Sequence, residues 1–325
     1  MALTFTELEA TTRDYFKADG GKAQDIYFTD SMACDYYLKK HKGLWERSPG
    51  GKSIMVPLEY DMQKGGFYTR SDALDSDDVE SVNSAKFLIK HGYGNATLYR
   101  TDELDNAGEY AEVQLVNQRL FGAQKTIRKY VANNFYSAAS DSATTPTGLR
   151  ALTSETSTSK YGNIAEDDLV SDDATKAWEG KTNSTTETIS LEVIQTLRSD
   201  AKFGNGSGGK PDVGFTTETL FNKISRILQV QQRFTTDSDT VKAGFTHVVY
   251  EGWIIVADDY CPSGYFFGIN SNHFGFVVHK KGLFVRTPWM NLQSTGVMGR
   301  SLKILWDGNM ICNNRQAHKA HSNLS

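Results

Sequence analysis

A single long amphipathic helix in a chain otherwise rich in strand-forming segments is the feature that most constrains the fold. From residue 109 to about 138 the apolar positions recur in steps of three and four, at Val113, Val116, Leu120, Ala123, Ile127 and Tyr130. That spacing places them on one stripe of a helix. A helix of about 30 residues is a rod of roughly 45 Å. One such segment in a β-rich chain favours the main helix of a domain over a coiled coil.

Strand chemistry is clearest after residue 246. Four apolar runs, separated by Gly, Asp, Pro and Asn, are centred on Val248, Ile255, Phe267 and Phe276, and they predict a mostly antiparallel sheet. Asp307-Gly308 between two apolar runs predicts a terminal hairpin. Helices are expected at 189–203 and 216–228, with a short strand at 213–215. The fold class is therefore α+β.

Residues 46–83 predict an extended loop in the form of a β-hairpin. Its two extended segments, 51–60 and 67–70, are joined around Lys64-Gly65-Gly66. The hairpin carries little apolar surface, and a two-stranded ribbon alone is marginal in water, so we expect it to lie on a neighbouring chain. Residues 1–45 form an arm whose many aromatic side chains must also dock. The expected inter-subunit contacts are Trp45, Lys52, Met62, Lys64, Phe67 and Arg70.

Composition excludes several classes of protein. The net charge is −4 and the pI near 6.0, which disfavours a sequence-reading nucleic-acid binder. The apolar runs are too short to span a bilayer. The chain has three cysteines, Cys34, Cys261 and Cys312, which lie far apart in the sequence. An odd number of widely spaced cysteines fits a protein made in a reducing cytoplasm and argues against a disulfide framework.

The order of elements resembles the tailed-bacteriophage major capsid protein family: an arm, a projecting hairpin, one long helix, a mixed α/β block and a final strand pair. No single motif is specific, but the combination covers nearly the whole chain from about Gly50. The segments that carry the resemblance are Ser53–Leu58, Gly148–Leu152, Lys210–Asp212, Tyr250–Gly264, Phe267–Asn270 and Trp306–His318.

The resemblance implies the tailed-phage capsid fold, a shell-building function without catalysis or cofactor, and a place in the virion after assembly in the host cytoplasm. It divides the chain into the arm (1–45), the extended loop (46–83), a peripheral domain (84–145 and 297–325) and an axial domain (146–296). The partners implied are copies of the chain in pentamers and hexamers, and enclosed double-stranded DNA. A portal and a separate scaffolding protein are also expected, and a decoration protein is left open; no membrane is involved. An encapsulin nanocompartment shell of the same fold is the first alternative.

Enclosed DNA is anionic, so we expect the inner surface to be less acidic than the outer one. The basic residues expected to face inward are Lys39, Lys40, Lys42, Arg47, Lys125, Arg128 and Lys129. Neutralisation of acids across subunit interfaces is an equal alternative for them.

Other constellations have simpler explanations. Gly204–Lys210 matches the GxxxxGK of a P-loop and suggests a nucleotide-dependent enzyme as a remote alternative, but Pro211 supplies no hydroxyl and blocks the following helix. Asp258-Asp259 with Glu251 fits a solvated turn better than an acid/base site.

Two further candidate sites involve residues near the end of the chain. Cys312, His318 and His321 offer only three irregularly spaced zinc ligands, which favours a buried cysteine and surface histidines. The resemblance suggests a covalent link between Lys64 and an asparagine of a neighbouring subunit, for which Asn309, Asn313 and Asn314 are the candidates. An ordinary charged lysine at position 64 is the simpler interpretation.

Overall fold

The computed structural model describes the chain in two compact units, and each is considered by itself. The described residues within 91–130 and 281–307 belong to unit 1, and those within 31–90, 131–280 and 308–325 belong to unit 2. The described residues are 31–40, 46–48, 50–74, 77–105, 115–140, 142, 144–155, 160–171, 174–201, 209–230, 247–293 and 296–325. Within them no helix is long and apolar enough to cross a membrane. The units divide the chain at points other than the predicted domain boundaries, so the peripheral and axial assignments stay predictions.

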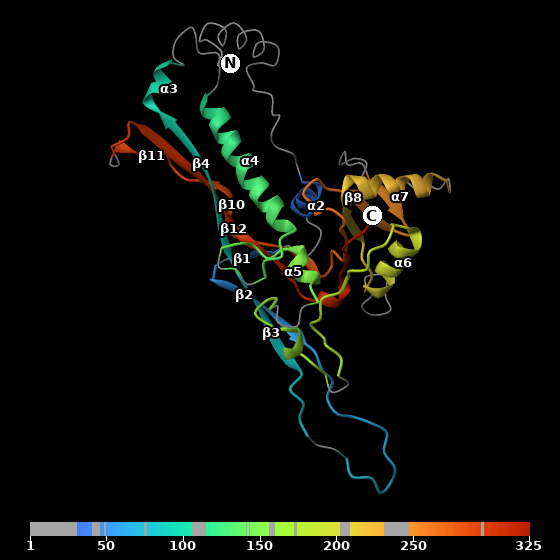
Figure 1. Cartoon of the computed structure of the whole chain (residues 1–325). Coiled ribbons are helices and arrows are strands. Elements are labelled where there is room, and N and C mark those ends of the chain that lie inside the picture. Colours follow the sequence, from blue (N-terminus) through green and yellow to red (C-terminus); the bar gives the residue numbers. More distant parts are fainter. Residues whose placement is uncertain are drawn as a thin grey trace. The chain divides into compact units, whose positions relative to one another are not determined.

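A six-stranded mixed sheet organises unit 2 (Figure 1). Its strand order is β5-β13-β9-β6-β8-β7, and β6 pairs in parallel with β8 but antiparallel with β9. All four residues of β6 are buried, as expected for a central strand. The strands are β5 (Thr182–Asn183), β6 (Val213–Thr216), β7 (His247–Tyr250), β8 (Trp253–Ala257), β9 (Phe266–Ile269) and β13 (Lys319–His321).

Two helices pack on this sheet through their apolar faces. Helix α6 (Leu191–Asp200) begins at the N-cap Ser190, whose hydroxyl accepts a hydrogen bond from the Val193 amide. Helix α7 (Glu218–Val230) presents Phe221 and Ile224 to the same core, which also holds Trp253 and Phe266. The predicted helices at 189–203 and 216–228 and the predicted strand at 213–215 are thereby confirmed.

Helix α2 (Met32–Lys40) is buried in an aromatic cluster of unit 2. The Tyr37 ring lies 5.3 Å from Phe274, 6.0 Å from Phe135 and 6.1 Å from Phe215, centroid to centroid. Such edge-on and tilted pairs add to the free energy of burial. The prediction that the aromatic residues of the arm must dock is therefore confirmed for Tyr36 and Tyr37, which are fully buried. Trp45 lies outside the described residues.

A five-stranded sheet contains the two longest of the described strands, β10 (Phe274–Arg286) and β12 (Gly299–Cys312). It is completed by β1 (Glu46–Ser48), β11 (Met290–Asn291) and β4 (Lys90–Tyr99), which pairs with β12. Two predictions are corrected here. The run at 274–278 belongs to this sheet and not to the sheet of β6 to β9, and 301–312 is one strand without a hairpin.

The polar side chains of the expected Asp-Gly turn explain why the strand continues. Asp307 Oδ1 lies 2.7 Å from His91 Nδ1. Asn309 is buried, and its Oδ1 accepts hydrogen bonds from the amide and the hydroxyl of Thr147 at 3.0 and 2.8 Å. These distant partners hold the backbone extended, so tertiary contacts override a strong local turn signal.

Helix α4 (Leu115–Phe135) confirms the long predicted helix over its described length. Its buried stripe is shifted from the predicted one, because Ala123 and Ile127 are buried while Val116 and Tyr130 are exposed. Leu120 is partly buried, and Val113 lies outside the described residues. Within unit 1, strand β4 comes so close that a Cβ on Gly94 would lie 2.4 Å from the Ala123 carbonyl oxygen. Only glycine fits there. The described residues also form short helices: α3 (Arg100–Asp105), α5 (Leu149–Thr153), and the 3-10 turns η2 (Glu166–Asp168) and η5 (Arg315–Ala317).

Candidate inter-subunit loop

A two-stranded ribbon in unit 2 supports a long loop. Strand β2 (Ser53–Glu59) pairs antiparallel with β3 (Val82–Leu88), from Ser53 opposite Leu88 to Glu59 opposite Val82. The predicted hairpin is therefore wrong in its second strand: the partner of 53–59 is 82–88 and not 67–70. Register explains the difference, because 82–88 can place Ala85 and Phe87 on the buried face, whereas 67–70 offers no second apolar residue on the side of Phe67.

The base of the ribbon is fixed to the segment around Gly162. The Lys86 amide donates a 2.7 Å hydrogen bond to the Gly162 carbonyl, and the Phe87 ring lies 5.4 Å from that of Tyr161. Gly162 has φ +63°, and a Cβ there would lie 2.9 Å from the Phe87 ring and 3.0 Å from Ala85. Both the conformation and the space demand glycine. The ribbon is thus rigidly held at one end.

The other end of the ribbon opens into the 60–81 loop, which extends away from the sheet of unit 2 (Figure 1). Its two sides are joined near the base by Gln63, which donates to the Val79 carbonyl at 2.8 Å and accepts from the Val79 amide at 3.3 Å. Lys64 Nζ lies 3.7 Å from Asp77 Oδ2. Further out, the Thr69 amide donates to Asp72 Oδ2 at 2.7 Å, and this bond lowers the pKa of the exposed Asp72 carboxyl.

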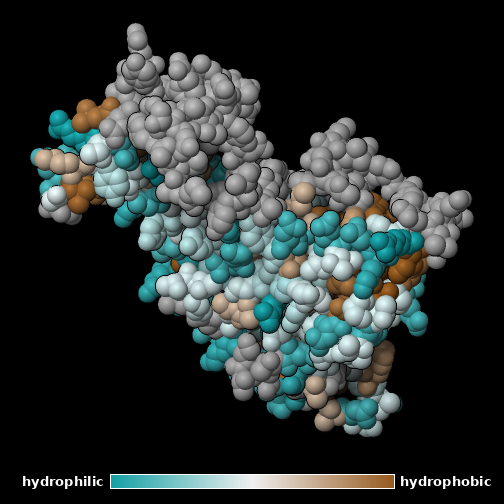
Figure 2. All heavy atoms as spheres, turned by 45° about the horizontal axis from the view of Figure 1, so that its top comes forward, coloured by the Kyte–Doolittle hydropathy of each residue, from teal (hydrophilic) through white to brown (hydrophobic). Residues whose placement is uncertain are grey.

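Apolar side chains on this loop are unusually exposed. Met62 is 79% exposed and Phe67 fully exposed, with Tyr68 and Leu74 also exposed. Single exposed apolar residues are normal, but four on one loop without a core of its own indicate a contact surface. On the face seen in Figure 2, hydrophobic residues gather in a few groups within a mostly hydrophilic surface.

Comparison with solved structures finds one architecture repeatedly. The capsid asymmetric unit of cyanophage A-1(L) matches with a TM-score of 0.64 at 14% identity, covering 94% of this chain and 95% of that one. The capsid of a native GTA particle matches with a TM-score of 0.58 at 10% identity, covering 94% of each chain. The holo-SrpI encapsulin complex of Synechococcus elongatus PCC 7942 matches with a TM-score of 0.56 at 8% identity, covering 100% of this chain and 97% of that one.

The chain has the tailed-phage capsid fold, which encapsulins share. No family model matches its sequence, and no curated protein sequence matches it. The likeness is therefore one of fold alone, carried by structure where sequence identity has fallen to 14% or below.

The structure places the predicted contact residues of this capsid fold largely together. Lys52 is exposed just before strand β2, Met62, Phe67 and Arg70 are exposed on the 60–81 loop, and Lys64 is also exposed there, beside Asp77. Of the predicted inward-facing basic residues, Arg128 is exposed while Lys125 and Lys129 are half-buried on α4. Lys42 lies outside the described residues. The side chains of Lys39, Lys40 and Arg47 are likewise not described.

The three asparagines considered for a link to Lys64 all have partners within the subunit. Asn309 is buried with Thr147, Asn313 Oδ1 lies 2.8 Å from His273 Nδ1, and Asn314 caps η5 by accepting from the Gln316 amide at 3.0 Å. Lys210 is exposed and followed by strand β6, where a P-loop needs a helix. The described residues contain no group of three or more His, Cys, Asp or Glu side chains suited to a metal ion.

Two predictions about polar groups are corrected by burial. Asp258 is buried and not part of a solvated turn: its Oδ2 accepts from the Ser31 hydroxyl at 2.7 Å and the Ala33 amide at 2.8 Å, which caps α2. His318 and His321 are buried and not on the surface. Burial, reinforced by His273 and Arg315, lowers the pKa of His318 to about 3, and its Nδ1 accepts from the Asn270 amide. Cys312 is a buried strand cysteine, as predicted.

The buried centre that the sequence did not reveal is Arg315. Its guanidinium donates to the carbonyls of Leu152 at 2.9 Å, Trp178 at 2.8 Å and Ser154 at 2.8 Å, and lies 3.2 Å from Glu166 Oε1. It also stacks over Tyr161 at 5.1 Å. Since Tyr161 contacts Phe87, this network supports the base of the ribbon. The partners of Arg315 lie far away in the sequence and are mostly backbone atoms, so no sequence motif could have predicted this network.

Proposed function

We propose that this chain is the major capsid protein of a tailed bacteriophage. Copies assemble into pentamers and hexamers, and these build the icosahedral shell that encloses the double-stranded DNA genome. The subunit acts by association and performs no catalysis. Its partners are other copies of itself, a scaffolding protein, a portal and the packaged DNA, and its place is the virion, after assembly in the host cytoplasm.

The 60–81 loop carries this proposal. Fully burying Met62, Phe67, Tyr68 and Leu74 against a neighbour would contribute on the order of 6 to 12 kcal/mol, at about 1.5 to 3 kcal/mol for each side chain. The ribbon anchors both ends of the loop, which limits, without removing, the backbone freedom that is lost when a neighbour docks. A loop built in this way supports association between copies with the capsid fold.

The test is assembly of the purified chain, observed by negative-stain microscopy and sedimentation velocity. We expect closed shells from the wild-type chain, with or without co-expressed scaffolding protein. The double substitution Met62→Ser with Phe67→Ser should leave a folded subunit that no longer closes shells. Removal of residues 62–67 should have the same effect.

Gly66→Ala is the matched control. A Cβ at Gly66 meets nothing within 4 Å, so this change beside Phe67 leaves the contact surface intact. We expect wild-type shells from it. Normal shells from the Met62→Ser, Phe67→Ser variant would exclude the 60–81 loop as the inter-subunit contact.

An encapsulin-like nanocompartment shell is the second candidate. It is favoured by one observation, the match of an encapsulin complex over the whole of this chain. The contents of shells purified from their natural source distinguish the two. Nuclease-protected double-stranded DNA supports the phage capsid, whereas an enclosed enzyme without DNA supports the nanocompartment.

A further inference from the structure

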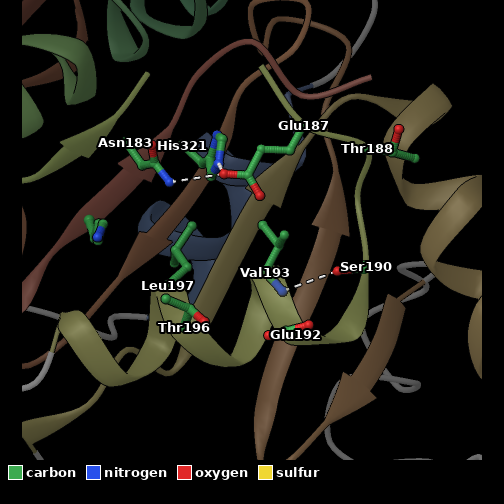
Figure 3. Close-up of a pocket in the computed structure, with 10 residues that line it drawn as sticks. Asn183, Glu187, Thr188, Ser190, Glu192, Val193, Thr196, Leu197 and His321 are labelled. Atoms are coloured by element: carbon green, nitrogen blue, oxygen red, sulfur yellow. Dashed lines mark hydrogen bonds and ion pairs between the residues drawn. The ribbon is translucent and has the colours of Figure 1, made fainter. Parts of the chain in front are cut away.

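A small pocket in unit 2 has acidic groups on two sides and apolar side chains between them. Its volume is about 290 Å³, which suits a small ligand and lies just below the usual range for drug-sized molecules. In Figure 3, Glu187 and Glu192 lie on opposite sides of the pocket, with Val193 and Leu197 between them. The lining residues come from the 183–190 segment, helix α6 and strand β13.

The backbone and one carboxylate oxygen of Glu187 are held within the subunit. Glu187 Oε1 accepts a hydrogen bond from Asn183 Nδ2 at 3.3 Å and lies 3.3 Å from His321 Nε2. The carbonyl of Glu187 accepts from the Ser325 amide at 3.0 Å. Within the described residues nothing donates to Glu187 Oε2, so this oxygen can accept from a ligand.

Glu192 is positioned by the start of helix α6. Ser190 caps the helix by accepting from the Val193 amide at 3.3 Å, and Glu192 follows in the first turn, where it is exposed. Among the residues that the structure describes, none donates to its carboxylate. The positive partial charge of a helix N-terminus is only about half an elementary charge. One carboxylate more than offsets it, so the pocket with both glutamates keeps a net negative charge.

The lysines beside the pocket do not neutralise these two acids. Lys319 Nζ lies 2.6 Å from Asp200 Oδ2, and Lys181 Nζ donates to the Asp200 carbonyl at 2.8 Å. Both ammonium groups are therefore engaged at Asp200. The two glutamates of the pocket are left for a cation from outside the subunit.

We propose that this pocket binds a linear aliphatic diamine, a molecule with one ammonium group at each end of a short methylene chain. One ammonium donates to Glu187 Oε2 and the other to the Glu192 carboxylate, while the methylenes lie along Val193 and Leu197. Hydrogen bonds between ammonium and carboxylate are charge-assisted on both sides, which is the stronger class. The methylenes match the apolar side chains between the acids, as the stem of a lysine does when it lies on apolar surface.

Other cations fit this arrangement less well. A divalent metal ion such as calcium or magnesium gathers about six or more oxygen ligands around one point, whereas the two carboxylates here stand on opposite sides of the pocket. A monoamine, or a single lysine side chain from another protein, carries one ammonium and can satisfy only one of the two glutamates. Two separated acids with apolar side chains between them therefore favour a dication with an aliphatic spacer.

Binding is measured on the full chain from the ¹³C methyl shifts of Val193 and Leu197 during titration with 1,4-diaminobutane. We expect saturable shifts at these methyls, and about five-fold weaker binding of n-butylamine, the factor for one ion pair open to solvent. The affinity for the diamine should fall as salt rises, because exposed charges are screened. Magnesium chloride at the same ionic strength should not reproduce the methyl shifts.

Two substitutions separate the roles of the glutamates. Glu187→Gln and Glu192→Gln should each abolish the preference for the diamine over the monoamine, because each removes one of the two charge pairs. Glu218→Gln is the matched control, since Glu218 is also exposed in the first turn of a helix, α7, but does not line the pocket. We expect wild-type binding from it. Glu192 is exposed, so its variant should fold even if the change at Glu187 weakens unit 2.

Three results would overturn the inference. One is equal affinity for diamine and monoamine in the wild type, which would show a single acidic contact. Another is an unchanged preference for the diamine in Glu192→Gln, which would leave Glu192 with its role at the helix start alone. The third is a set of methyl shifts that magnesium reproduces, which would indicate unspecific attraction of cations. The titration reports on one subunit, so its result does not depend on shell formation.

Discussion

Replacing Arg315 by lysine tests how far one buried side chain supports the ribbon. The substitution keeps the positive charge beside Glu166 but removes the planar fork of donors. In the native chain that fork bonds the carbonyls of Leu152, Trp178 and Ser154, with a longer bond to Ala151 at 3.4 Å. A lysine ammonium is a compact point charge and cannot reach the carbonyls and the carboxylate together.

The expected loss follows from counting the groups left without a donor. At least two buried carbonyls lose their partner, and each unsatisfied buried group costs about 1 to 3 kcal/mol. The stacking of the guanidinium over Tyr161 is lost as well. We therefore expect Arg315→Lys to lower the free energy of unfolding of unit 2 by about 2 to 6 kcal/mol. Arg315→Ala should cost more, because it leaves the buried Glu166 carboxylate unpaired.

The assay is urea unfolding followed by tryptophan fluorescence, combined with hydrogen exchange at Lys86, whose amide bonds to Gly162. Both should report weakening in Arg315→Lys, since Tyr161 and Trp178 link Arg315 to the ribbon. Arg150→Lys is the control, because Arg150 is exposed and stacks on Tyr265 at 5.3 Å. A loss below about 1 kcal/mol with unchanged exchange at Lys86 would refute the argument.

Three further predictions follow from burial and charge. Ile127→Asp places a carboxylate in the buried face of α4 and should cost several kcal/mol, whereas Tyr130→Asp on the exposed face should be nearly neutral; thermal unfolding of the pair checks this. Burial raises the pKa of Cys312 to about 12 and that of Cys261 well above its usual value, so neither thiol should react with a disulfide reagent at pH 8 until the chain unfolds, which absorbance titration measures. Helix α4 has basic residues at 119, 125, 128 and 129 and no acidic residue, so Lys125→Gln with Arg128→Gln and Lys129→Gln should weaken DNA binding and its salt dependence if these residues face the enclosed genome. Equal salt slopes for wild type and variant would contradict an inward orientation.

The local sequence pattern was enough to predict helices and strands in which buried side chains recur with the period of the helix or strand itself. In these elements, the pattern of apolar residues along a short stretch of sequence reflects which side chains are buried. They are α4 with its three–four spacing, β6 to β9 with their apolar runs, and α6 and α7 with their apolar faces, and all of them lie where expected. The shifted stripe on α4 shows the limit of this reasoning. Tyr130 fits the helical period, yet it is exposed, because its neighbours in the fold, and not its spacing, decide burial.

Pairing over long distances in the chain was not predictable from local pattern. The sequence of β3, VNSAKFL, is half polar because one face of the ribbon is exposed, so nothing in it marks it as the partner of β2. The Asp-Gly signal at 307 failed for the same kind of reason. Thr147 lies 162 residues from Asn309, and only the folded chain reveals that this contact keeps β12 straight.

The contrast between the base and the loop of the ribbon explains why a resemblance in fold could be recognised although no single sequence motif is specific. The base is determined by interior packing: Gly162, Phe87, Tyr161 and Arg315 each meet atoms of the same chain at close range. In the described part of the 60–81 loop the restraints are mostly local or between its two sides, as at Gln63, Lys64 and the Thr69–Asp72 turn. Its side chains are free to vary with whatever surface they meet, subject only to keeping the loop open and its apolar groups exposed. This chain can therefore share its fold with a solved capsid structure at 14% identity, because the interior contacts that hold the base can be made by different residues.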